Sequence, residues 1–158
     1  MIVGDHLTEQ AKRRPEKVAV ICGADRLTFS ELNEEANRLA NWLLDRGLKK
    51  GDRAVVLLPN CAEFAPIYFA LMKIGVVAVI LDFRLSPPEM APLFDETEAK
   101  VLLTHSKQRG FALRMMREKE DLKHVVIVGE GRSSEELQPY EEIVSKGDSS
   151  EPPITVGE

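Results

Sequence analysis

Four short apolar runs recur between residues 53 and 128, and stretches of helical periodicity separate them. The runs are 53–58, 76–81, 100–104 and 124–128, and the predicted helices between them are 62–74, 88–97 and 107–119. Strands that are apolar on both faces are typical of a parallel sheet covered by helices. Because crossovers between parallel strands are right-handed, the pattern predicts a three-layer α/β fold, a mostly parallel sheet with helices on both faces.

The residues before this pattern predict a small N-terminal hairpin between two helices. Residues 5–14 have helical periodicity, and the β-rich runs 18–22 and 26–29 flank a glycine-containing turn. A second helix is predicted to begin with Ser30 as its N-cap. Gly47 is expected to end that helix, because glycine is favoured just after a helix C-terminus.

The chain of 158 residues suits one domain with a proper core. Residues 134–146 predict a last helix, interrupted by Pro139. The segment that follows is polar and contains two prolines, which is typical of a linker. We therefore expect a domain over residues 1–147 and a linker over 148–158. A linker at this position indicates that the chain belongs to a longer protein.

Composition excludes several classes of function. Lysine and arginine total 21 against 26 acidic residues, so the net charge of −5 argues against nucleic acid as a partner. Two cysteines are too few for a disulfide scaffold. The longest apolar stretch, 75–81, is far shorter than the ~20 residues that span a membrane. With no signal-peptide pattern at its start, the chain is expected to be soluble and cytoplasmic.

Few single residues suggest chemistry, and phosphate-binding glycine motifs are absent from the sequence. His105 follows a predicted strand, at the sheet edge where open α/β folds bind ligands, although it also suits a solvated loop. Cys61 comes directly before a predicted helix, where a thiol can become reactive, although a bystander cysteine is the simpler interpretation. The residues by themselves therefore contain no catalytic constellation.

Basic side chains gather on one predicted helix and could bind a phosphate-bearing ligand. They are Lys107, Arg109, Arg114, Arg117 and Lys119. The alternative is a solvated surface helix with scattered cations.

Eight motifs occur in an order that is specific when taken together. They are PEKVAV (15–20), LTFSELN (27–33), ANRLA (36–40), GLKKGDRA (47–54), LLPN (57–60), LMKIG (71–75), LSPPEM (85–90) and AKVLLT (99–104). In this order they resemble the N-terminal subdomain of adenylate-forming, AMP-binding enzymes, which include acyl-CoA synthetases, luciferases and the adenylation domains of peptide synthetases. The resemblance is greatest to fatty-acid and aryl-acid CoA ligases.

The resemblance implies an enzyme that uses ATP and Mg²⁺ to convert a carboxylic acid into an acyl-adenylate and pyrophosphate. The acyl group then passes to the thiol of CoA. The family's catalytic motifs have no counterpart in this sequence, so the resemblance assigns no catalytic residue. We expect a fragment of an acyl-CoA ligase that is inactive by itself. The alternatives are a stand-alone module that binds a nucleotide or CoA, and a structural domain that self-associates as a homodimer.

The resemblance also implies one binding surface. In CoA-forming relatives the CoA nucleotide lies near the loop after the second parallel strand and the start of a following helix. The matching positions here are Phe83, Arg84, Lys107 and Arg109. Their cations would suit the phosphates of CoA.

Overall fold

A five-stranded parallel sheet forms the centre of the computed structural model, which describes residues 3–130, 134 and 136–153. Its strands are β3 (Arg53–Leu57), β4 (Val77–Ile80), β5 (Val101–His105), β6 (His124–Val128) and β7 (Leu137–Pro139). Their order in the sheet is β4-β3-β5-β6-β7, and each neighbouring pair is parallel. The predicted α/β class is therefore confirmed.

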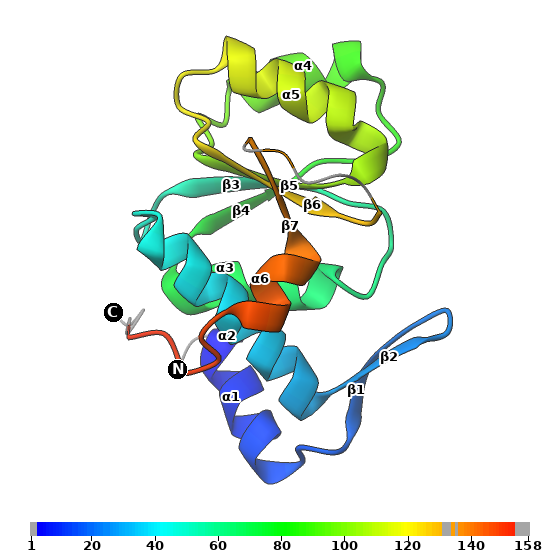
Figure 1. Cartoon of the computed structure of the whole chain (residues 1–158), viewed down its shortest axis with the longest axis vertical. Coiled ribbons are helices and arrows are strands. Elements are labelled where there is room, and N and C mark those ends of the chain that lie inside the picture. The colour runs from blue at the N-terminus through cyan, green and yellow to red at the C-terminus, as the bar shows by residue number, and fades with distance from the viewer. Residues whose placement is uncertain (1–2, 131–133, 135, 154–158) are drawn as a thin grey trace.

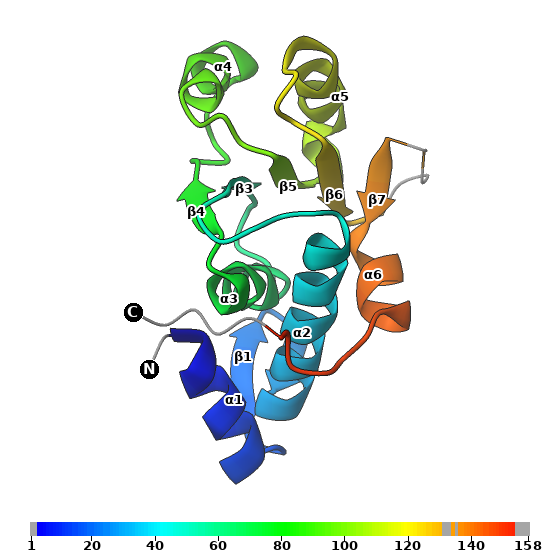
Figure 2. The same ribbon diagram turned by 90° about the vertical axis from the view of Figure 1, so that its left-hand side faces the viewer.

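Helices cover both faces of the sheet, which gives the three layers seen in Figures 1 and 2. On one face lie α2 (Phe29–Asp45), α3 (Phe64–Ile74) and α6 (Tyr140–Lys146), with α1 (Val3–Arg13) packed outside them. On the other face lie α4 (Pro87–Asp95) and α5 (Arg109–Glu118), the latter preceded by a 3₁₀ turn at Ser106–Gln108. The predicted N-terminal hairpin is also present, as the antiparallel pair β1 (Val18–Cys22) and β2 (Asp25–Thr28).

Strand β3, which lies between β4 and β5, contributes to two hydrophobic cores. Ala54 and Val56 belong to the core beneath α2 and α3, whereas Val55 and Leu57 belong to the core beneath α4 and α5. This alternation follows from the two-residue period of a strand. It also explains why residues 54–57 are all apolar, since neither face of the strand meets water there.

The N-cap of helix α2 lies two residues earlier than predicted, so the assignment of Ser30 is wrong. Thr28 is the N-cap: its Oγ1 accepts the Glu31 N–H at 3.2 Å, and Glu31 Oε2 accepts the Thr28 N–H at 2.8 Å. A threonine followed three residues later by glutamate satisfies two helix-end donors reciprocally. The predicted end is confirmed, because Gly47 follows the C-cap residue with a φ of +83°.

The predicted helix over 134–146 is wrong in its first part. Leu137–Pro139 instead forms strand β7, and α6 begins directly after Pro139, which is its N-cap. Proline lacks an N–H and is therefore confined in sheets to edges and strand ends. The interruption that Pro139 predicts is real, but it separates a strand from a helix.

The described residues contain no helix that combines the length and the apolar character needed to cross a bilayer.

Candidate functional site

The connections of the sheet diverge beside β3, at the edge where its parallel strands end. The chain leaves β3 toward α3 on one face, whereas it leaves β4 and β5 toward α4 and α5 on the other. Loops that separate in this way leave a crevice at the carboxyl edge of an open sheet, and ligands bind there in α/β folds. The architecture alone therefore selects this edge as the candidate site.

A groove of about 540 Å³ lies at this switch point. Its walls are the loop after β3, together with Phe64 of α3, and the loop after β4. The lining residues are Leu58, Pro59, Asn60, Phe64, Ile80, Leu81, Asp82, Phe83 and Arg84. Phe83 and Arg84 were predicted from the resemblance, whereas Pro59, Asn60 and Phe64 were missed as site residues. The available signal was that Pro59 and Asn60 follow the end of β3 closely and that Phe64 opens the next helix.

Arg84 is held by a carboxylate two residues away. Its Nη2 donates to Asp82 Oδ2 at 2.7 Å, and its Nε lies 3.0 Å from Asp82 Oδ1. The Arg84 N–H also donates to Asp82 Oδ1, at 2.9 Å. The guanidinium and this N–H lower the pKa of the Asp82 carboxyl to about 2. An anionic ligand would therefore meet Arg84 already paired with a negative charge.

Phe83, in the loop after β4, and His105, the last residue of β5, come together although they are far apart in the sequence. Their ring centroids are 6.3 Å apart in an edge-to-face arrangement. His105 Nδ1 accepts the Lys107 N–H at 3.1 Å, so the histidine caps the 3₁₀ turn that carries Lys107. The histidine is therefore a structural part of this edge rather than a free loop side chain.

Gly129, just after β6, allows His105 to take this position. A Cβ at Gly129 would lie 2.8 Å from His105 Nε2, and the φ of +94° is one that side chains rarely adopt. Both observations explain why a glycine stands there.

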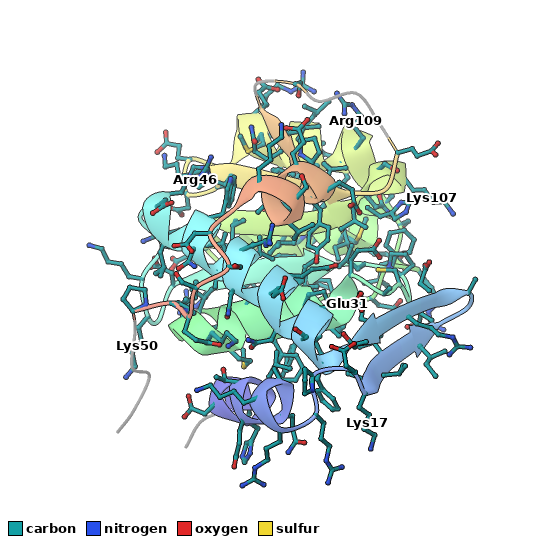
Figure 3. All side chains as sticks on the ribbon, turned by 60° about the horizontal axis from the view of Figure 1, so that its bottom comes forward. Lys17, Glu31, Arg46, Lys50, Lys107 and Arg109 are labelled. Atoms are coloured by element: carbon teal, nitrogen blue, oxygen red, sulfur yellow. The ribbon has the colours of Figure 1, made fainter. Side chains whose placement is uncertain are left out.

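The two cations assigned from the resemblance lie where the chain enters α5. Lys107 is in the 3₁₀ turn and Arg109 is the first residue of α5. Figure 3 shows both on the same side of the molecule. The four predicted positions therefore follow the carboxyl ends of β4 and β5, and the contact of Phe83 with His105 joins these two connections.

The other cations of the predicted basic cluster make local contacts. Arg114 pairs with Glu118 at 2.8 Å, and Lys119 pairs with Asp95 of α4. Arg117 Nε donates to the carbonyl of Leu113 at 3.3 Å. These contacts support the interpretation of α5 as a surface helix with locally paired cations.

Cys61 lacks the environment of a reactive thiol. Partial burial, together with nearby Glu63, raises the pKa of Cys61 to about 11. Helix α3 starts only at Phe64, and Glu63 is its N-cap. The hypothesis of a helix-activated thiol is therefore wrong, because only a thiolate is nucleophilic.

Within the described ranges, no group of three or more histidine, cysteine, aspartate or glutamate side chains could hold a metal ion.

Comparison with known proteins places this architecture in a family. The model of the family described as AMP-binding enzyme matches residues 7–156. The chain belongs to this family. A medium/long-chain-fatty-acid–CoA/3-oxocholest-4-en-26-oate–CoA ligase of Mycobacterium tuberculosis is 34% identical to this AMP-binding chain over 128 residues, which are 80% of this chain and 23% of the ligase. Triostin synthetase I of Streptomyces triostinicus is 32% identical over 137 residues, which are 86% of this chain and 26% of the synthetase.

Solved structures of other proteins share the fold. The anthranilate CoA ligase AuaEII, in complex with anthranoyl-AMP, superimposes with a TM-score of 0.87 and 25% identity, covering 95% of this chain and 29% of that one. MbtA of Mycobacterium smegmatis gives a TM-score of 0.85 and 29% identity, and the match covers 98% of this chain and 29% of MbtA. The chain spans about a quarter of the length of the curated relatives described above.

Proposed function

We propose that this chain is part of an ATP-dependent acyl-CoA ligase, an acid–thiol ligase acting on fatty or aryl acids. The carboxylate would attack the α-phosphorus of ATP, which releases pyrophosphate and leaves an acyl-adenylate. The thiol of CoA would then displace AMP and form the thioester. The family match over residues 7–156 carries the proposal, and the fatty-acid CoA ligase among the relatives supports its substrate class.

We assign the carboxyl edge of the sheet to CoA within this enzyme. Phe83 offers an aromatic face, and Arg84, Lys107 and Arg109 offer cations suited to phosphates. ATP and Mg²⁺ would be held by other parts of the complete enzyme, so the chain alone is expected to be inactive. A reducing, cytoplasmic location fits the proposal, because Cys22 and Cys61 are both free thiols.

Pyrophosphate release tests the activity. The complete protein that contains this chain is incubated with ATP, Mg²⁺ and either dodecanoate or benzoate, with and without CoA. We expect acid-dependent pyrophosphate release, conversion to a thioester when CoA is present, and no release by residues 1–158 alone. Acid-dependent release without any thioester would contradict the CoA ligase and leave an adenylating enzyme.

Self-association is a second candidate role, and the edge strand β4 favours it. Val77 and Ile80 are 49% and 54% exposed on this strand, which pairs with β3 alone among the described strands. Sedimentation velocity over a range of concentrations tests this role, and a monomer at every concentration would exclude it. A stand-alone binding module would instead show CoA or ATP binding by residues 1–158 in calorimetry.

A further inference from the structure

Residues 148–151 lie across helix α2 and are held by a ladder of asparagines. Figure 2 shows this segment leaving α6 and passing in front of α2 toward α3. Asn41 Nδ2 donates to the carbonyls of Asp148 and Ser150, both at 2.9 Å, and Asn37 Nδ2 donates to the carbonyl of Ser149 at 3.0 Å. We call residues 148–151 the strap. Most of these bonds engage its backbone, so they fix its path without selecting its side chains.

Glu151 is the strap residue recognised through its side chain. Its Oε1 accepts from Asn33 at 2.9 Å and from Asn37 at 3.2 Å. Its Oε2 accepts from Lys73 Nζ of α3 at 2.6 Å and from Thr8 Oγ1 of α1 at 3.2 Å. One carboxylate therefore joins three helices to the strap.

Lys73 lies at the centre of this cluster and contacts both α1 and the strap. Its side chain is 4% exposed, and Nζ donates to Thr8 Oγ1 at 2.7 Å as well as to Glu151. A buried ammonium needs all its hydrogen-bond partners, because an unpaired buried charge is strongly unfavourable. Loss of the strap would therefore leave Lys73 with an unmet charge beside α1.

Helix α1 packs directly on the stem of the same lysine. A Cβ at Gly4 would lie 2.8 Å from Lys73 Cγ and 3.1 Å from its Cα. This close approach fixes Lys73 between α1 and the core, and it places the Thr8 hydroxyl at the ammonium. A rearrangement of Lys73 toward water would need α1 to move.

The charges around the pair agree with this geometry. Burial acts to raise the pKa of Glu151, but the bonds from Lys73, Asn33 and Asn37 hold it below its ordinary value. Burial lowers the pKa of Lys73, and Asp5 of α1 adds a favourable negative charge. Each of the two side chains therefore favours the charged form of the other, so the pair is held as a carboxylate and an ammonium.

We propose that the strap keeps α1 docked on α3, with Lys73 as the positioning residue that couples the two segments. This inference is independent of the proposed ligase activity. Undocking of the strap and undocking of α1 are one event, because both segments satisfy the same ammonium. Linkage then requires the coupling to be reciprocal: a change in α1 must loosen the strap as a change in the strap loosens α1.

Hydrogen–deuterium exchange of residues 1–158 tests the coupling. Glu151→Gln is expected to speed amide exchange in α1 about tenfold, as loss of a charged hydrogen bond would. Thr8→Val, a change of similar shape on α1, is expected to speed exchange in the strap. Glu120→Gln removes the same charge from an exposed position and serves as the control. Unchanged α1 exchange in Glu151→Gln, or unchanged strap exchange in Thr8→Val, overturns the proposal.

A double substitution tests the route through Lys73. Lys73→Met replaces the buried ammonium with an apolar side chain of similar length, while the Glu151 carboxylate, which is 43% exposed, keeps its bonds from Asn33 and Asn37. In this background, adding Glu151→Gln is expected to leave α1 exchange unchanged. The same acceleration in both backgrounds would show that Lys73 does not couple the segments, even if the single variant Glu151→Gln folds poorly.

Discussion

Asp82 competes with any anionic ligand for Arg84, because the two side chains already form a close pair at the mouth of the groove. Under the proposed assignment to CoA, Asp82→Asn is expected to lower the KM for CoA in the complete enzyme, and Arg84→Ala to raise it about fivefold. The kcat should change little, since the proposal gives both residues a role in CoA binding and none in the chemical step. Steady-state kinetics with CoA as the varied substrate measures both effects.

Arg26→Ala, on the distant hairpin, is the control. Equal KM values for CoA in the wild type and all three variants would remove Arg84 from the CoA site.

Asp52 links the residues that precede β3 to the residue that precedes β5, and it makes the free energy of unfolding depend on pH. It accepts the Lys49 N–H at 2.8 Å and pairs with Lys100 Nζ at 2.7 Å. Burial acts to raise the pKa of Asp52, but these bonds hold it below its ordinary value. A carboxyl with a lowered pKa adds stability above its unfolded-state value of about 3.9, and this stability is lost as pH falls through the folded value.

The variant Asp52→Asn is therefore expected to lose about 1 kcal/mol of unfolding free energy at pH 7 and much less near pH 3. Urea denaturation at the two pH values measures the difference. A loss that is equal at both would show that the charge of Asp52 plays no part.

At the scale of elements, the start of α2 depends on the capping box of Thr28 and Glu31. Thr28→Ala is expected to cost about 1 kcal/mol, because it leaves the Glu31 N–H without its acceptor. Ser30→Ala, at the position that sequence reasoning chose, should cost less, since the Ser30 hydroxyl donates to the exposed side chain of Glu34 and caps no backbone N–H among the described bonds. Urea midpoints of the two variants decide between the caps, and a larger loss for Ser30→Ala would restore the predicted one.

The long apolar elements could be predicted from sequence because their periodicity reports burial directly. Strand β7 could not, because three residues ending in Pro139 carry too little pattern and depend on pairing with β6. The edge-to-face contact of Phe83 with His105 was also beyond reach, since it arises only when the crossover of α4 sets β4 and β5 on either side of β3. The four predicted site positions came from a family resemblance, and the groove beside them came from topology.

Alternate residues of β3 belong to the two hydrophobic cores, one on each face of the sheet. We therefore expect the two cores to unfold together, as one cooperative unit. Leu57 lies in the core beneath α4 and α5, whereas Trp42, the single tryptophan of the chain, packs on the opposite core. Leu57→Ala is expected to cost about 3 kcal/mol. Trp42 fluorescence and far-UV circular dichroism should then show the same lowered urea midpoint. A fluorescence midpoint that stays at its wild-type value would mean that the two layers unfold separately.

The two edge strands of the described sheet, β4 and β7, differ in their capacity to pair with a strand of another copy. In β7, Leu137 donates its N–H to the carbonyl of Ser134, and Pro139, which faces the same way, has no N–H to offer. This edge therefore offers an incoming strand fewer N–H donors than the edge of β4 does. A polymer grown by strand addition needs two receptive edges on every copy. Among the described strands β4 is the more receptive edge, so strand addition favours a pair of copies over a fibril.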